Sequence, residues 1–246
     1  MNDSSEFIPD AFKVDIVYEF EFDNLKTLKF EVKSLLDKAD VNVRSSSENE
    51  WCKLDFHKCK DCPLDSSVYP LCPAADSISD IVKEFFNEFS YSMCKCTVYF
   101  PERTVIAVKP VQDALFSLIG LRMATSNCPF LSKFKPLARF HEPFASVFYT
   151  IYRSVSFFLL SKYFTDLKYS QGTIDFSELK SFYSKINVVN TNMSKRLNEL
   201  VNADATPNCI TILSVFGKSI TYLFDDYIET LEKLFLINPI SPLNHK

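Results

Sequence analysis

With 246 residues the chain is long enough to bury a sizeable core, as one large domain or two small ones. Its content of 47% hydrophobic and 24% charged residues is typical of a globular protein and argues against disorder. The chain has only 3 Gly and a formal net charge of −4, so it offers no glycine-rich loop for phosphates and no general attraction for nucleic acid or anionic lipid.

The N-terminus and the most apolar stretches of the sequence indicate the cellular compartment of the protein. The first residues, MNDSSEFIPDAFK, have neither the basic start nor the apolar run of a signal peptide. Arg122 and Arg153 interrupt the most apolar stretches, which fall short of the roughly 20 apolar residues that a bilayer span needs. We therefore expect a cytoplasmic protein without a membrane span. In that reducing compartment its 8 cysteines are expected to be thiols or metal ligands rather than disulfides.

Two segments of the first half predict β-hairpins. Residues 12–22 alternate partly between apolar and polar side chains, which is typical of a strand. The pair Asp23-Asn24 is a turn signal, so residues 25–32 can return as the second arm. Residues 94–108 predict a second hairpin. Between the two hairpins, the cysteine-rich residues 51–75 carry three prolines and are expected to have little regular structure.

Apolar residues at helical spacing predict five helices, at residues 77–89, 111–125, 144–164, 175–200 and 206–234. The first is expected to open with a capping box formed by Ser77 and Asp80. The last is expected to start with Thr206 as N-cap and Pro207 in its first turn.

These elements together predict an α+β fold. Its N-terminal half holds two β-hairpins, a Cys-rich loop and helices, and its C-terminal half is a helical bundle. We expect a mixed region at residues 1–165 that carries the cysteine site. A helical region at residues 166–246 is expected to pack on it within one structural unit.

The last predicted helix is apolar over an arc too wide to face water along its length. Its stripe, with a second apolar set that includes Phe224 and Phe235, needs two neighbours. The helices at 144–164 and 175–203 can supply them within the chain. The alternative is a protein partner or a second subunit, which would make the protein a homodimer through its C-terminal helices.

A cysteine cluster is the strongest chemical signal of the sequence. Cys59 and Cys62 form a C-x2-C pair, a spacing that lets two thiolates bind one ion from a single turn, and Cys72 follows in the same loop. Cys128 is the preferred fourth ligand, because Cys62, Cys72 and Cys128 are each followed by proline, which stiffens the chain beside the sulfur.

Other assignments remain open for this cluster. His57, Cys52 and His141 are alternative fourth ligands. The metal is predicted to be structural zinc, with an iron–sulfur cluster as the alternative. A third alternative is a set of buried cysteines without any metal, because a thiol behaves as a small hydrophobe. No arrangement of residues predicts a catalytic site.

A basic segment follows Cys128 in the sequence. Lys135, Arg139 and Arg153 outnumber the acids there and could hold an anion or a nucleic-acid phosphate. In the alternative interpretation, Arg139 and Arg153 pair with acids of the N-terminal half. Nucleic acid is not expected as a partner, although this segment keeps that alternative open.

The cysteine motif also carries a resemblance. The chain reads FH-x-C-x-x-CPL from Phe56 to Leu64, CP at Cys72, CP at Cys128, and KP-x-ARFH from Lys135 to His141. Over about residues 12–165 this pattern resembles a family of uncharacterised bacterial proteins of similar length. The resemblance implies an N-terminal hairpin and an α-helical C-terminal part, but no activity. Asn127 and Lys60 stand where that pattern has Gly and Pro.

Two functions follow as hypotheses. The first is a non-catalytic binding protein in which structural zinc ties the N-terminal half to the basic loop and the helices recognise a partner. The second is an iron–sulfur protein with a redox or nucleic-acid-processing role.

Overall fold

The computed structural model describes residues 15–32, 49–167, 174–200 and 205–237. The chain forms two compact units, each assembled from two stretches. Residues 1–144 and 185–215 form unit 1, and residues 145–184 and 216–246 form unit 2. The predicted boundary between residues 1–165 and 166–246 stays a prediction. The two units are defined by their internal contacts, and such contacts do not show whether a segment folds independently. None of the described helices combines the length and the apolar character needed to cross a bilayer.

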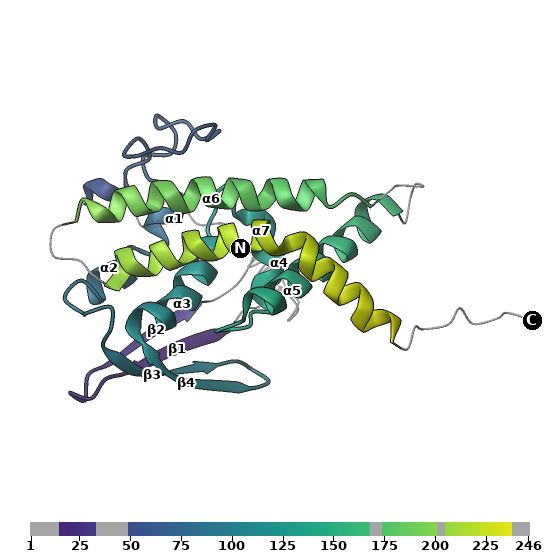
Figure 1. Cartoon of the computed structure of the whole chain (residues 1–246). Coiled ribbons are helices and arrows are strands. Elements are labelled where there is room, and N and C mark those ends of the chain that lie inside the picture. Colours follow the sequence, from purple (N-terminus) through teal and green to yellow (C-terminus); the bar gives the residue numbers. More distant parts are fainter. Residues whose placement is uncertain (1–14, 33–48, 168–173, 201–204, 238–246) are drawn as a thin grey trace, which may run out of the picture. The chain divides into compact units, whose positions relative to one another are not determined.

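Unit 1 contains one four-stranded antiparallel sheet, which confirms the α+β prediction. Its strands are β1 (Ile16–Glu21), β2 (Thr27–Val32), β3 (Met93–Tyr99) and β4 (Thr104–Pro110). Both predicted hairpins are present, and β1 pairs with β3 to join them in the order β2-β1-β3-β4 (Figure 1). Residues 12–14 of the first predicted strand lie outside the described residues.

The sheet buries the face that the alternation predicts. Ile16, Tyr18 and Phe20 are at most 2% exposed, and Cys96 and Val98 of β3 lie fully buried beside them. The rings of Phe20, Phe30 and Phe85 pack against one another on this face with centroids 5.1 to 6.0 Å apart. The burial of these large rings is the main favourable contribution of the sheet to folding.

Helix α3 (Val111–Thr125) covers the buried face of the sheet (Figure 1). Its buried residues, among them Val111, Leu115, Leu118, Ile119 and Leu121, lie on several sides of the helix. A helix that is apolar all round needs partners all round. Leu213 of α7 packs beside one of these sides, because a Cβ atom at Gly120 would meet Leu213 Cδ2 at the ordinary van der Waals distance of 3.5 Å.

Helices α6 (Ser177–Asn198) and α7 (Ala205–Leu236) each contribute residues to both units. In unit 1, Val189, Met193 and Cys209 belong to the same core as α3. The prediction for the start of the last helix is wrong in detail. Thr206 lies inside α7, and its buried hydroxyl has no hydrogen-bond partner among the described residues.

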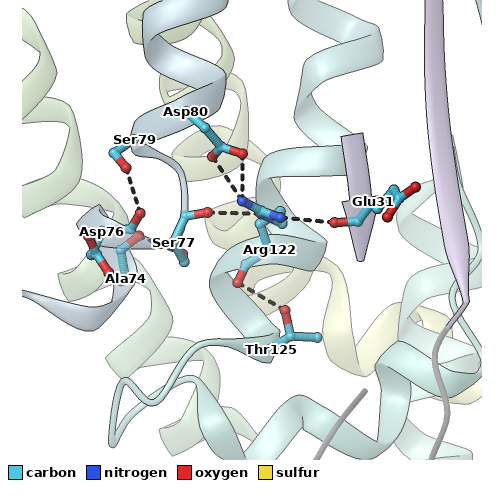
Figure 2. A network of polar contacts seen from close by, with 8 residues as sticks. All are labelled: Glu31, Ala74, Asp76, Ser77, Ser79, Asp80, Arg122 and Thr125. Carbon is cyan, nitrogen blue, oxygen red and sulfur yellow. Dashed lines mark hydrogen bonds and ion pairs between the residues drawn. The ribbon is translucent and has the colours of Figure 1, made fainter. Parts of the chain in front are cut away.

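The helix predicted at 77–89 is wrong in its start and in its length. Two short helices, α1 (Pro73–Asp76) and α2 (Ser79–Glu84), occupy this region. The Ser77 hydroxyl donates to the Ala74 carbonyl, 2.8 Å away, so it closes α1 and does not cap α2. Figure 2 shows the second reason, because the Asp80 carboxylate points to Arg122 of α3 and is not part of a capping box.

Arg122 connects three elements of unit 1. Its guanidinium donates to the Ser77 carbonyl at 2.9 Å and to the Glu31 carbonyl, at the end of β2, at 3.0 Å. It also makes two bonds of 2.8 Å to the Asp80 carboxylate (Figure 2). The arginine side chain is only 12% exposed, whereas that of Asp80 is 50% exposed. The bond to the Ser77 carbonyl is part-buried, whereas the bonds to Glu31 and Asp80 are exposed, so the first is the better shielded part of this network.

Replacing Arg122 by Met should destabilise the protein by about 1–3 kcal/mol, because the Ser77 and Glu31 carbonyls lose their donor, the first of them in a part-buried site. The Asp80→Asn variant is the matched control and should cost at most about 1 kcal/mol, because an exposed ion pair contributes little. Urea unfolding of both variants measures the difference. Equal losses would mean that the ion pair, and not the carbonyl contacts, stabilises this region.

Unit 2 is a small helical unit. It contains α5 (Val147–Lys162), a π-helical turn at Tyr163–Leu167, the first turns of α6 and the rest of α7. The Ser146 side chain accepts from the Tyr149 amide and caps α5. Rings of α5, of the α6 entry and of α7 meet in a row, with Phe158, Phe176 and Phe224 at centroid distances of 6.0 and 5.8 Å. Phe224 is 1% exposed, and Lys180 lies over its ring.

The predicted apolar stripe of α7 is buried only in part. Ile220, Phe224 and Leu231 are buried, but Leu234 is 55% and Phe235 is 62% exposed. The stripe therefore ends near Leu231, and the last turn of α7 presents apolar side chains to solvent.

Replacing Phe224 by Asp should unfold or aggregate the protein, because a carboxylate would replace the buried ring that packs on Phe176, at a cost of about 3–5 kcal/mol. The Phe235→Asp variant is the control on the same helix and should stay folded. Thermal unfolding and sizing chromatography test both variants. A folded, monomeric Phe224→Asp protein derived from a dimeric parent would place Phe224 in a subunit interface instead.

Candidate metal centre

The cysteine-rich loop of unit 1 is closed at its base by backbone pairing. Lys53 and Leu71 form an antiparallel bridge. On either side of it, the Leu54 amide donates to the Pro70 carbonyl at 2.9 Å and the Cys72 amide to the Cys52 carbonyl at 2.8 Å. The loop thus leaves the core after the short 3-10 helix η2 (Glu50–Cys52) and returns at Cys72, the N-cap of α1.

Cys59 and Cys62 lie on one tight turn of this loop. The Cys62 amide donates to the Cys59 carbonyl at 3.2 Å, and Asp61 between them has φ 64°. Asp is one of the few residue types that tolerate this left-handed conformation. This turn brings the backbones of the two C-x2-C cysteines close together, at the spacing that metal sites use for two ligands of one turn.

Cys128 reaches the region from another part of the chain. It follows α3 after a turn in which the Ser126 hydroxyl donates to the Met123 carbonyl at 2.6 Å and accepts from the Cys128 amide at 3.3 Å. Cys128 is 7% exposed. Burial raises the pKa of its thiol to about 11, whereas hydrogen bonds from the Leu131 and Phe130 amides oppose this rise. Such N–H donors stabilise a thiolate, whether or not it binds a metal.

The structure brings the four predicted ligands into mutual electrostatic range. The pKa of Cys59 is raised to about 12, first by burial and then by three neighbouring thiols, Cys72, Cys128 and Cys62. Cys72 and Cys62 also act on the pKa of Cys128. These thiols come from two distant segments, so their proximity is a result of the tertiary fold. Within the described part of the chain, however, no group of three or more His, Cys, Asp or Glu side chains is arranged to hold a metal ion.

Two of the three alternative ligands contact other side chains, and the third is fully buried. His57 Nε2 contacts the Glu199 carboxylate, and its ring packs against Phe56 with centroids 4.9 Å apart. His141 Nε2 lies 2.6 Å from the Tyr18 hydroxyl, on the buried face of the sheet. Cys52 is fully buried at the base of the loop.

Two residues of the basic segment contact side chains from other parts of unit 1. Arg139 pairs with Glu102 at 2.7 Å, as the alternative interpretation of this segment expects. Lys135 donates to the Asn127 side chain at 2.9 Å. Arg153 belongs to α5, in unit 2. The structure therefore does not assemble these three predicted residues into one anion site within unit 1.

Arg196 is the residue at this site that the sequence interpretation missed. Its guanidinium is 2% exposed and donates to three backbone carbonyls of the loop base, Trp51 at 2.6 Å, Lys53 at 2.7 Å and Leu54 at 3.1 Å. It also acts on Cys59, whose pKa it lowers against the larger effect of burial. The sequence contains one signal that Arg196 is buried. It follows Val189 and Met193 at helical spacing, on the apolar stripe of α6.

Comparison with known proteins assigns a family but no activity. No curated protein and no solved structure matched the chain. One family model matched, described as a domain of unknown function, DUF6901, and it covers residues 16–236. This match extends beyond the resemblance noted at residues 12–165 and includes the two last helices. The chain belongs to the DUF6901 family.

Proposed function

We propose that Cys59, Cys62, Cys72 and Cys128 bind one structural zinc ion. The observation that supports this proposal is that Cys59 and Cys62 share one turn, closed by the bond from the Cys62 amide to the Cys59 carbonyl. The thiols of Cys72 and Cys128 lie near enough to raise the pKa of Cys59. Four cysteines form one of the known types of closed structural zinc site. Binding would require the side chains to close on the ion from their present arrangement, which is the usual coupling of metal binding to folding.

The loop itself supports a structural role for the ion. Between its base and Cys72 it holds few buried residues, and a local turn at Asp65–Ser67 and the Lys58 contact with the Leu64 carbonyl supply much of its polar order. A loop with so small a core gains its stability from a metal or from its neighbours. Zinc bound also by Cys128 would fasten it to the segment that follows α3.

The protein as a whole is proposed to be a cytoplasmic binding module. None of its 8 cysteines, all of which lie in described residues, forms a disulfide, as a reducing compartment favours. The last turn of α7 and the residue that follows it expose Leu234, Phe235, Leu236 and Ile237, each at least 55% exposed. An exposed apolar cluster of this kind is typical of a contact surface for a protein partner or a second copy.

Replacing Cys62 by Ser should reduce the zinc content to near zero and lower the free energy of unfolding by several kcal/mol, because the binding energy of a structural site contributes to folding. Elemental analysis and thermal unfolding measure the two effects. The Cys94→Ser variant is the matched control, since Cys94 is buried in β3 away from the loop. It should lose some stability but keep the metal. Protein isolated without oxygen should be colourless, and a brown colour would assign an iron–sulfur cluster instead.

Replacing Cys128 by Ser should change a four-sulfur coordination shell into one with three sulfurs. X-ray absorption at the zinc edge is expected to show four sulfurs at about 2.3 Å in the unmodified protein. The His57→Ala variant should leave this shell unchanged, because the ring contacts Glu199. A shell of three sulfurs and one nitrogen that loses the nitrogen in His57→Ala would exclude Cys128 as the fourth ligand.

A further inference from the structure

Strand β4 forms one edge of the sheet in unit 1, next to β3. The Phe100 amide donates to the Arg103 carbonyl at 2.8 Å, which fixes the positions that bond across the β3–β4 ladder. Bonded and non-bonded positions alternate in an antiparallel pair, so Thr104, Ile106 and Val108 turn their backbone N–H and C=O groups away from β3. Among the described residues, no other backbone hydrogen bond reaches these outer groups.

The side chains at this edge are apolar and exposed. Ile106 is 60% and Val108 is 65% exposed. Lys109 is the one charged residue of β4, and it lies on the opposite face of the sheet, with its ammonium 5.7 Å from the centre of the Phe144 ring. Proteins usually protect an edge strand with charges, because its unpaired backbone groups otherwise attract another strand.

The other edge of the sheet, β2, is protected in the ways that β4 is not. By the same alternation Thr27, Lys29 and Glu31 turn their backbone groups outward there. Lys29 carries a charge and pairs with Glu19. The Glu31 carbonyl already accepts a hydrogen bond from Arg122 at 3.0 Å (Figure 2). The β4 edge is therefore the one that offers both free backbone groups and apolar side chains.

The order of residues in β4 fits a second copy of the same strand. Antiparallel pairing about a two-fold axis at Ala107 sets Ile106 opposite Val108 of the second copy, and the reverse. Both are outward positions, so each pair can exchange two backbone hydrogen bonds and join two β-branched side chains. An axis at Ile106 would instead set Arg103 opposite Lys109 of the other copy, and like charges directly opposite each other are destabilising. Charge therefore favours the register centred on Ala107.

We infer that β4 is a homodimer interface, through which the sheets of two copies join edge to edge into one continuous antiparallel sheet. The pairing also brings the exposed Ile106 and Val108 of the two copies together, beside Tyr99 and Met93, which are 40% and 49% exposed on β3. The inference goes beyond the proposed function, because it requires neither the zinc site nor the apolar end of α7.

Replacing Ile106 by Pro removes the N–H that this interface needs and that the β3 ladder does not use, and edge strands tolerate proline at such positions. Each copy loses one bond to the other, at about tenfold each, so the dissociation constant of the dimer should rise about 100-fold. Sedimentation velocity over a concentration series measures this constant. Thr27→Pro removes the corresponding outward N–H of β2 and is the matched control, which should leave the dimer unchanged.

A second variant covers the case in which Ile106→Pro does not fold. Ile106→Lys keeps the N–H but places a charge on the exposed edge, and it should also weaken the dimer. An unmodified protein that is monomeric at every concentration would overturn the inference and leave the edge to a strand of a different protein. A dimer that resists both Ile106 variants, or that Thr27→Pro weakens equally, would overturn it as well.

Disulfide crosslinking tests the register. In the proposed dimer the two copies of Ala107 face each other on the axis, so Ala107→Cys should form a covalent dimer under mild oxidation. Thr104→Cys is the control, because its two copies would lie six residues apart along the strands, about 20 Å. The unmodified protein under the same oxidation accounts for the native thiols. Crosslinking of Thr104→Cys but not of Ala107→Cys would contradict the proposed pairing.

Discussion

The burial of α3 is the constraint on which the arrangement of unit 1 depends. Its buried residues face in several directions, so no single layer can cover them. The sheet covers one side, and residues of α6 and α7 belong to the same core. On another side, Leu213 of α7 packs against the position of Gly120. The helix also positions Cys128, the proposed zinc ligand, which follows shortly after its C-terminal end.

Two arginines connect this core to the loops around it, and they differ in how their charge is compensated. Arg122 bonds two carbonyls and also meets the half-exposed carboxylate of Asp80. Arg196 is more deeply buried and bonds carbonyls in all three of its contacts with described residues. The first arrangement therefore includes an ion pair, whereas the contacts that the second makes with described residues are hydrogen bonds to backbone carbonyls.

Much of the architecture could be predicted from local patterns. The period of two in residues 12–22 predicted a strand, which the structure shows at Ile16–Glu21, and the apolar spacing correctly predicted helices at 111–125 and within 144–164. The short helices near Ser77 could not be predicted in the same way. There the residue pair of a capping box was present, but Arg122, which is distant in the sequence, offers Asp80 two hydrogen bonds in place of a cap. The extent of the α7 stripe could likewise not be predicted, because Leu231 is buried and Leu234 is exposed although both follow the same apolar spacing.

The sequence by itself determined the fold class, the two hairpins and the candidate thiols, because strand period, helix period and C-x2-C spacing are local properties of the chain. Only the tertiary structure decided that β1 pairs with β3, that Cys128 approaches a loop more than fifty residues earlier, and that Arg196 lies buried beneath it. These relations join segments that no local period connects. They follow from the burial of apolar surface by the whole chain. Arg196 is a charged residue on an apolar stripe, and it meets its hydrogen-bond partners only when the chain is folded.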